Sequence, residues 1–169
     1  MTPRLTLVLG GARSGKSRYA EALVEALAPP WVYVATAQPF DDEMRERIAA
    51  HRARRSAEWR TLDAPLDVAS AIRSAHAHAP VLVDCLTLWL TNLALGAQDA
   101  RAAVEDLRAA SRDRSGPVVL VSNEVGLGIV PENALARRFR DLAGEMHQSI
   151  AIDAERVVFM VAGLPVIVK

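Results

Sequence analysis

One short segment near the start of the chain, Gly10-Gly11-Ala12-Arg13-Ser14-Gly15-Lys16-Ser17, constrains the fold more than any other feature. It matches the pattern G-x-x-x-x-G-K-S and directly follows the apolar run Leu5–Leu9. Such a loop binds phosphate when a buried strand holds it, when glycines let backbone N–H groups turn inward, and when a helix points its positive end at the anion. Apolar spacing from Ala20 to Leu27 predicts that helix. A plain glycine-rich turn would not need this strand and helix, so we expect the loop to bind nucleotide phosphates.

Two side chains of this loop carry predicted chemical roles. We expect Lys16 to bind the β and γ phosphates as a point charge. We expect the Ser17 hydroxyl to complete the coordination of a Mg²⁺ ion.

The chain as a whole limits the class of protein. Its 169 residues predict one domain over 1–169. The 20 basic and 20 acidic residues balance, which argues against nucleic acid or an anionic membrane as a partner. Cys85 is the single cysteine and can form no internal disulfide, and no apolar stretch reaches the roughly 20 residues that span a bilayer. The first residues lack the cleavage pattern of a signal peptide, so we expect a cytoplasmic protein.

Short apolar runs alternate with helical patterns along the chain. The strand-like runs are Leu5–Leu9, Trp31–Ala35, Val81–Asp84, Val118–Ser122 and Val157–Ala162. With the phosphate loop after the first run, this order predicts the three-layer α/β fold of P-loop NTPases (RecA-like), with a mostly parallel sheet. Only a few residues separate the last run from 166–168, so we expect a C-terminal antiparallel hairpin.

Helices are expected between these runs. One is capped by Asp41 or Asp42 and carries Met44, Ile48 and His51 on one stripe. Others are expected over Leu66–Ala77, from Asp84 through Leu93, over Ala100–Ala110, and after Pro131 with the apolar stripe Leu135, Phe139, Leu142, Met146 and Ile150. Such stripes are typical of core packing. The composition of 112–117 predicts a surface turn.

Four polar groups lie at or just beyond the ends of predicted strands. They are the loop Gly10–Ser17, Thr36 with Gln38, Asp84, and Asn123 with Glu124. Ligands of open α/β sheets bind outside the carboxyl ends of the strands. We therefore expect these four groups to line one crevice.

Asp84 has two interpretations. An acidic residue after a buried strand of a P-loop protein ligates Mg²⁺ directly or through water. Because Asp84 stands just before Cys85 and Leu86, it could instead cap the next helix. The phosphate loop favours the metal role.

His51 lies in the arginine-rich segment 41–60 and also has two interpretations. A charge run is usually a solvated helix face, and a lone histidine is usually a buried, hydrogen-bonded one. The arginines could instead bind a triphosphate, and their charge would keep His51 neutral and nucleophilic near pH 7. Two other questions stay open. Residues 123–133 either position a substrate or turn the chain. Trp31, Trp59 and Trp89 either stack on a substrate or pack, which is the commoner role.

These residues together closely resemble the bifunctional adenosylcobinamide kinase and adenosylcobinamide-phosphate guanylyltransferase family of cobalamin biosynthesis, over nearly the whole chain. The resemblance rests on the segments Gly10–Ser17, Ala35-Thr36, Asp41–Met44 leading to His51, Trp59–Thr61, Asp84–Thr87, and Ser122–Gly126 onward to Pro131. The phosphate loop alone indicates a superfamily, whereas the Asn-Glu-Val-Gly stretch and the spaced histidine indicate the family.

The resemblance implies two reactions at one nucleotide site. ATP or GTP phosphorylates the hydroxyl of the aminopropanol arm of adenosylcobinamide. GTP then donates GMP to that phosphate, giving adenosylcobinamide-GDP and pyrophosphate. The GMP passes through a covalent phosphoramidate on a histidine, which corresponds to His51 here. The resemblance also implies a homotrimer.

The resemblance further implies roles for particular residues. His51 and Lys16 are the catalytic positions, Asp63 meets the ribose, and Ser17 and Asp84 serve the metal. The implied nucleotide-binding positions are Gly10, Gly11, Ala12, Arg13, Ser14, Gly15, Lys16, Ser17, Val34, Ala35, Thr36, Arg52, Ala53, Arg54, Arg55, Asp63 and Asp84.

Two other function classes compete with the bifunctional enzyme. One is a P-loop small-molecule kinase without nucleotidyl transfer, and the other is a nucleotide-responsive assembly module without turnover. His51 separates the bifunctional enzyme from the plain kinase, because only nucleotidyl transfer through the protein needs a nucleophile near the α-phosphate. Turnover separates both enzymes from the assembly module.

Overall fold

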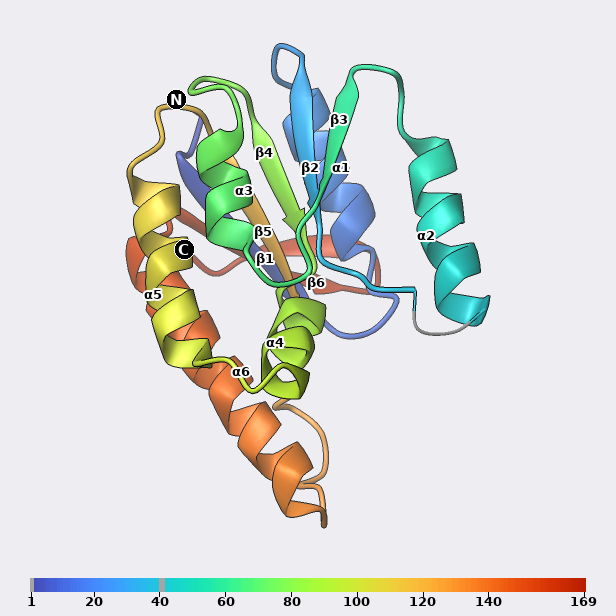
Figure 1. The fold of residues 1–169 in the computed structure, drawn as a ribbon, viewed down its shortest axis with the longest axis vertical. Coiled ribbons are helices and arrows are strands. Elements are labelled where there is room, and N and C mark those ends of the chain that lie inside the picture. The colour runs from blue at the N-terminus through green and yellow to red at the C-terminus, as the bar shows by residue number, and fades with distance from the viewer. Residues whose placement is uncertain (1, 40–41) are drawn as a thin grey trace.

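The computed structural model describes residues 2–39 and 42–169, which form a seven-stranded sheet with helices around it (Figure 1). The strands are β1 (Leu5–Gly10), β2 (Trp31–Ala35), β3 (Trp59–Asp63), β4 (Val81–Asp84), β5 (Val118–Asn123), β6 (Arg156–Val161) and β7 (Leu164–Ile167). The helices are α1 (Lys16–Glu25), α2 (Asp42–Arg54), α3 (Val68–Ser74), α4 (Leu86–Leu95), α5 (Ala100–Arg112) and α6 (Ala134–Asp153).

The strand order is β3-β2-β4-β5-β1-β6-β7, and every pair is parallel except β6 with β7. The predicted parallel sheet and the C-terminal antiparallel hairpin are thus confirmed. β1 lies between β5 and β6, so the loop that follows it leaves the middle of the carboxyl edge. In this register Gly10 lies beside Asn123, and Ala35 lies beside Asp84.

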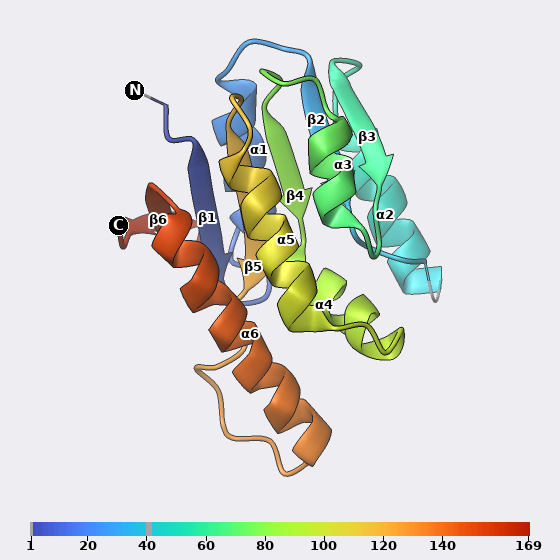
Figure 2. The same cartoon turned by 60° about the vertical axis from the view of Figure 1, so that its left-hand side comes forward.

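Helices cover the two faces of the sheet unequally. Figure 2 shows α3, α5 and α6 in front of the sheet and α1 behind it. The larger core, which includes Leu7, Val34 and Leu120, packs under α3 to α6, and a smaller core around Val8 and Val121 packs under α1. Strand residues that alternate between two buried faces produce the continuous apolar runs of the sequence. The three-layer prediction is confirmed.

The structure corrects the predicted set of strands by adding β3, which the sequence analysis did not predict. It pairs in parallel with β2 at the edge of the sheet, and only Trp59 of its residues is buried. Edge strands carry polar and charged residues, here Arg60 and Asp63, so they show no continuous apolar run.

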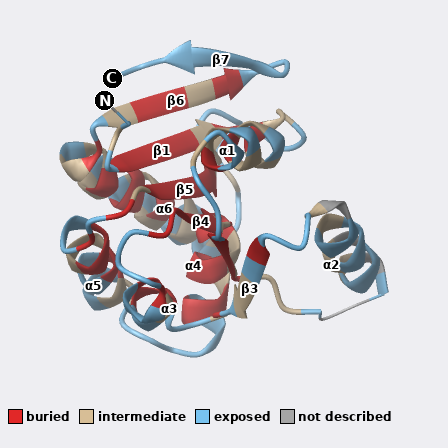
Figure 3. Ribbon diagram, turned by 90° about the horizontal axis from the view of Figure 1, so that it is seen from above, coloured by how far each residue is buried: buried red, intermediate tan, exposed pale blue. Residues whose placement is uncertain are grey.

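Helix α2 stands apart from the rest of the molecule beyond β3 (Figure 3). It begins at Asp42, whereas the alternative cap Asp41 lies outside the described residues. Its predicted stripe is visible in the exposure: Met44, Ile48 and His51 are half-buried, and the other side chains of α2 that the structure describes are exposed. Contact along this stripe is partial, because none of these three side chains reaches the core.

One packing prediction is wrong, and another holds only in part. Leu135 is 72% exposed, because the first turns of α6 project past the sheet. Met146 and Ile150, further along the predicted stripe, are buried in the core. Arg114 lies in the predicted surface turn but is 6% exposed. Its guanidinium lies at the C-terminal end of α3 and donates hydrogen bonds to the carbonyls of Ile72, Ala75, His76 and Ala79.

Helix boundaries differ slightly from the prediction. α3 is shorter than Leu66–Ala77, because the Asp67 side chain caps it by accepting a hydrogen bond from Ser70 N. The long helix begins at Ala134, where the Asn133 side chain caps it. Among the described residues, no helix combines the length and the apolar character that a membrane crossing requires.

Candidate active site

The phosphate loop has a backbone that two of its glycines make possible. At Gly10 φ is +154°, and a Cβ would lie 2.7 Å from Ser14 Oγ and 2.8 Å from the Met160 carbonyl oxygen. Gly15 is left-handed at φ +93° and is the N-cap of α1. An L side chain would be strained at either position. The loop therefore closes tightly against β6 and points the N-terminus of α1 into its interior.

Lys16 is held inside this loop. Its side chain is 7% exposed, and Nζ donates hydrogen bonds to the Gly11 carbonyl at 2.5 Å and to Ser14 Oγ at 3.4 Å. Burial lowers the pKa of Lys16, while the neighbouring Cys85 and Asp84 oppose the shift. Asp84 is thus close enough to act on Lys16 electrostatically, which places both groups at the same end of the sheet.

The structure brings the four predicted polar groups to one edge, as parallel pairing requires. Glu124 N donates to the Gly10 carbonyl at 2.9 Å, and Asn123 Nδ2 contacts Cys85 Sγ at 3.8 Å. Thr36 is fully buried, and its hydroxyl exchanges hydrogen bonds of 2.8 Å with the backbone N–H and carbonyl of Cys85. Thr36 therefore ties β2 to β4 rather than facing solvent.

Asp84 does not cap α4. Cys85 is the N-cap of that helix and makes no side-chain cap hydrogen bond. Asp84 Oδ2 instead accepts a hydrogen bond from Tyr33 OH at 3.3 Å. Burial and the Asp84 charge both raise the pKa of Tyr33, so the phenol stays protonated and can donate. The carboxylate is free of the capping role that its sequence position allowed.

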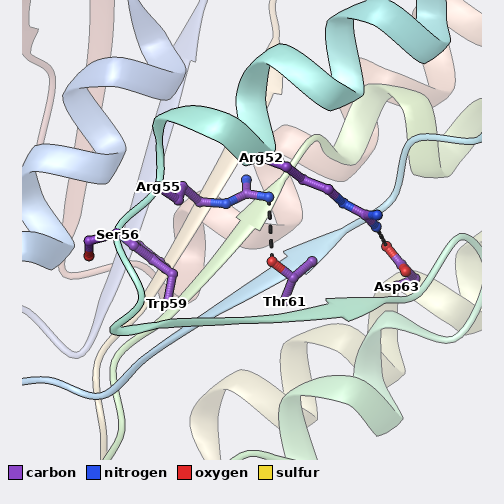
Figure 4. Close-up of a pocket in the computed structure, with 6 residues that line it drawn as sticks. All are labelled: Arg52, Arg55, Ser56, Trp59, Thr61 and Asp63. Carbon is purple, nitrogen blue, oxygen red and sulfur yellow. Dashed lines mark hydrogen bonds and ion pairs between the residues drawn. The ribbon is translucent and has the colours of Figure 1, made fainter.

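A cavity between α2 and β3 gathers other predicted residues (Figure 4). It is lined by Arg52, Arg55, Ser56, Trp59, Thr61 and Asp63. Arg52 NH2 pairs with Asp63 Oδ1 at 2.6 Å, and the Arg55 guanidinium lies 3.7 Å from the ring centre of Tyr33. Two cations and one carboxylate line an open cavity, which suits the phosphates and hydroxyls of a nucleotide.

Other predicted positions lie differently. Val34 is fully buried between β3 and β4, so its side chain faces the core. Ala35 is half-buried at the end of β2, and Ala53 is exposed on α2. The Arg54 side chain lies outside what the structure describes.

His51 lies far from the phosphate loop along the sheet. Its helix α2 stands beyond β3, and β3 is four strand positions from β1. Strands are spaced about 4.8 Å apart, so β3 and β1 are separated by roughly 19 Å. The predicted site residues thus fall into two groups: one at the phosphate loop with Asp84, and one at the cavity beneath α2.

A second cavity lies on the other side of the phosphate loop. It is lined by Gly11, Ala12, Arg13, Ser14, Glu124, Leu127, Phe159, Met160, Val161 and Ala162. Most of these side chains are apolar, and Glu124 supplies the carboxylate. Two residues of the segment 123–133, Glu124 and Leu127, therefore form a wall of this cavity beside the phosphate loop.

A buried polar chain beneath this wall escaped the sequence analysis. His147 of α6 is 6% exposed, and its Nε2 lies 2.8 Å from Ser122 Oγ. Ser122 Oγ lies 3.0 Å from Thr87 Oγ1, which accepts a hydrogen bond from Asn123 N at 2.7 Å. Burial lowers the pKa of His147, and Glu124 opposes the shift. In the sequence His147 only extends the apolar stripe of α6, so no local signal indicated its contacts.

The three tryptophans are packing residues. Trp31 and Trp59 contact each other with ring centres 5.4 Å apart, and Trp89 is 1% exposed in the larger core. Trp59 also lines the cavity beneath α2.

The whole chain was compared with protein families and with known proteins. Residues 6–168 match the family model described as "Cobinamide kinase / cobinamide phosphate guanyltransferase". The chain belongs to this family. It is therefore a bifunctional enzyme, a kinase and guanylyltransferase of cobalamin biosynthesis, which removes the plain kinase and the assembly module as alternatives.

Curated relatives of this cobinamide kinase and guanyltransferase match over nearly its full length. The "Bifunctional adenosylcobalamin biosynthesis protein CobP" of Pseudomonas aeruginosa is 54% identical, covering 96% of each chain. The "Bifunctional adenosylcobalamin biosynthesis protein CobU" of Salmonella typhimurium is 44% identical, covering 98% of this chain and 99% of the relative.

Solved structures show the fold that this family member shares with more distant proteins. The flagellar accessory protein FlaH from Methanocaldococcus jannaschii superposes with a TM-score of 0.55 at 12% identity, covering 98% of this chain and 77% of FlaH. A KaiC-like protein from Pyrococcus horikoshii gives 0.50 at 15% identity, covering 92% and 71%. The RecA-like P-loop architecture is confirmed.

The phosphate-loop edge of this cobinamide kinase fits Mg²⁺ in its donor chemistry. Ser17 and Asp84 offer a hydroxyl and a carboxylate oxygen, the hard ligands that Mg²⁺ prefers. Among the described residues, no three His, Cys, Asp or Glu side chains cluster as an all-protein metal site. Mg²⁺ in phosphoryl-transfer enzymes needs no such cluster, because substrate phosphates and water complete its coordination.

Proposed function

We propose that this enzyme phosphorylates adenosylcobinamide at the phosphate loop and then transfers GMP from GTP to the product through a guanylylated His51. The observation that carries the proposal is the presence of two cation-lined sites on one chain. The first surrounds Lys16, and the second, beneath α2, contains Arg52 and Arg55 next to the helix that bears His51.

In the kinase step, Lys16 and the backbone N–H groups of Gly10–Ser17 bind the β and γ phosphates of ATP or GTP. Their positive charge stabilises the charge that develops on the transferred phosphoryl group. Ser17 and Asp84 would hold Mg²⁺, which neutralises phosphate charge when bound. The acceptor oxygen bonds to the γ-phosphorus as the bond to the bridging oxygen breaks and the nucleoside diphosphate leaves.

In the transfer step, a neutral imidazole nitrogen of His51 attacks the α-phosphorus of GTP. The N–P bond forms, the bond to the bridging oxygen breaks, and pyrophosphate leaves. An oxygen of adenosylcobinamide-phosphate then attacks the same phosphorus, releasing His51 and giving adenosylcobinamide-GDP. Arg52 and Arg55 bind the triphosphate, and Asp63 binds the ribose after it separates from Arg52.

This chemistry requires α2 to move. In-line attack needs reacting atoms about 3–3.5 Å apart, whereas the helix that carries His51 stands beyond β3, four strand positions from the phosphate-loop strand β1. The Arg52–Asp63 pair that spans from α2 to β3 is half-exposed, so it contributes at most about 1 kcal/mol and is released readily. GTP can replace Asp63 as the partner of Arg52 and draw α2 inward.

The finer assignments belong to the same proposal. We expect a homotrimer, and exposed apolar side chains support contact with another copy of the chain: Leu127, Ile129, Val130 and Leu135, on α6 and the loop before it. We expect a cytoplasmic enzyme, in keeping with an unpaired Cys85.

Covalent labelling tests the role of His51. After incubation with GTP labelled at the α-phosphate, we expect label on the parent protein that is stable to base and lost in acid, as a phosphoramidate is. His51→Asn should abolish it. The matched control is His76→Asn, which removes an exposed histidine before β4 and should label like the parent. Equal labelling of His51→Asn would exclude the covalent mechanism.

A further inference from the structure

Glu124 lies beside the phosphate loop, on the wall of the second cavity. It directly follows β5, its backbone N–H is bonded to Gly10 at the start of the phosphate loop, and it lines the cavity that Gly11 to Ser14 border. Its side chain is 21% exposed, so the carboxylate is reachable from that cavity. The opposite wall, 159–162, is mostly apolar. An acceptor alcohol on a large, partly apolar molecule fits such a cavity.

The two carboxylate oxygens of Glu124 are held from different sides. Oε1 accepts a hydrogen bond from Gly126 N at 2.5 Å. Oε2 lies 3.6 Å from Nδ1 of His147, which is slightly longer than a hydrogen bond. Nδ1 is buried and has no other hydrogen-bond partner. A buried polar atom without a hydrogen-bond partner destabilises the fold. Nδ1 of His147 therefore favours a position of Glu124 in which Oε2 lies close to it.

Glu124 sets which ring nitrogen of His147 carries the proton. An ionised carboxylate can only accept, so the neutral tautomer that suits this pair carries its proton on Nδ1, toward Glu124 Oε2. In that tautomer Nε2 accepts a hydrogen bond from Ser122 Oγ, Ser122 Oγ accepts one from Thr87 Oγ1, and Thr87 Oγ1 accepts one from Asn123 N. The end of β5, the first turn of α4, and α6 together thus orient one carboxylate.

From this geometry we infer that Glu124 is the general base of the kinase step and that His147 is the positioning residue that orients it. The inference rests on the kinase activity in the proposed function. As the acceptor oxygen bonds to the γ-phosphorus and the bridging oxygen leaves with the nucleoside diphosphate, the hydroxyl proton passes to Glu124 Oε2 and afterwards to water. Guanylyl transfer needs no such base, because its acceptor is a phosphate oxygen that is already anionic.

This difference between the two reactions gives a sharp test of Glu124. The full-length protein with Mg²⁺ is assayed for phosphorylation of adenosylcobinamide and, separately, for GMP transfer to chemically prepared adenosylcobinamide-phosphate. General-base catalysis contributes roughly 10²–10⁴-fold, so Glu124→Gln should lower the kinase kcat at least about 100-fold. The rate of GMP transfer by Glu124→Gln should fall about threefold at most, far less than its kinase kcat. The matched control is Glu132→Gln, an exposed carboxylate of the same loop.

The outcomes separate this inference from the proposed function. Retained kinase activity in Glu124→Gln, or an equal loss of both reactions, would overturn the general-base role while leaving the two activities in place. Absence of both reactions in the parent protein would instead contradict the proposed function itself.

Two variants of His147 separate positioning from simple support of the fold. The amide nitrogen of Asn stands where Nδ1 stands, so His147→Asn keeps the contact toward Glu124 and loses the one to Ser122. Gln reaches as far as Nε2, so His147→Gln keeps Ser122 and loses Glu124. Misplacing a catalytic group costs roughly 10²-fold, so we expect His147→Gln to lower the kinase kcat 10- to 100-fold at unchanged KM.

His147→Asn should restore the kinase kcat to within about fivefold of the parent, well inside the cost of misplacement. If the histidine only supports the fold through Ser122, the order reverses, and Gln restores activity where Asn does not. That reversal, or equal losses in both variants, would overturn the positioning role.

Discussion

Single side chains in this protein act through contacts that lie far away in the sequence. Arg114 shows this most directly, because one buried guanidinium bonds to four carbonyls around the end of α3. Those carbonyls include groups that a helix end leaves without partners. Burial lowers the pKa of Arg114, yet arginine remains charged, so the four acceptors also compensate a buried cation.

We expect Arg114→Lys to destabilise the fold by roughly 2–4 kcal/mol, since one ammonium cannot reach all four carbonyls and leaves buried acceptors unpaired. Urea unfolding followed by circular dichroism measures the change. Arg138→Lys, on the exposed side of α6, is the control and should stay within about 0.5 kcal/mol. A loss below 1 kcal/mol at Arg114 would show that water replaces the missing hydrogen bonds.

Secondary-structure elements differ in how firmly the fold holds them. The sheet and α3 to α6 share the larger core, whereas no described side chain of α2 is buried. A helix with little buried area opens at low free energy. The half-exposed pair of Arg52 with Asp63 adds little to hold it. An element of this kind is suited to move when a ligand offers it new contacts.

Amide hydrogen exchange tests this at the level of whole helices. Without nucleotide, residues 42–54 should exchange much faster than residues 100–112 of α5, whose apolar side packs in the core. GTP with Mg²⁺ should slow exchange in α2 at least tenfold, because the nucleotide would tie Arg52 and Arg55 to the sheet. Protection of α2 equal to that of α5 without nucleotide would mean that the helix does not need to move.

The molecule as a whole leaves an apolar surface where α6 and the preceding loop project from the sheet (Figure 2). Ile129 is 98% exposed and Leu127 is 80% exposed. Exposed apolar groups gathered in one region usually mark a contact with another protein. A second copy of the chain is the partner that the proposed homotrimer requires.

We expect sedimentation equilibrium to give three copies of the 18.3 kDa chain for the parent protein. Ile129→Glu should shift the mass toward the monomer, because a buried carboxylate at the interface would lack a partner. Ser74→Glu, at an exposed residue of α3, should leave the mass unchanged. An assembly that tolerates Ile129→Glu would place the interface on another surface.

The sequence by itself determined the phosphate loop, the order of strands and helices, and the meeting of Gly10–Ser17, Asp84 and Glu124 at one edge. These follow from local periodicity and from parallel pairing, which brings strand ends together whatever lies between them. Strand β3 escaped because an edge strand shows no apolar run.

Only the tertiary structure decided which groups lie close together. It placed His51 beyond the edge of the sheet, buried Arg114 inside an apparent turn, and brought His147 of α6 against Glu124. Each depends on residues between 23 and 42 positions away, or on the three strands that lie between β3 and β1, and no local pattern encodes such distances. The phosphate loop could be predicted because strand, loop and helix are contiguous, whereas the positions of His51 and His147 relative to it depend on packing between distant elements.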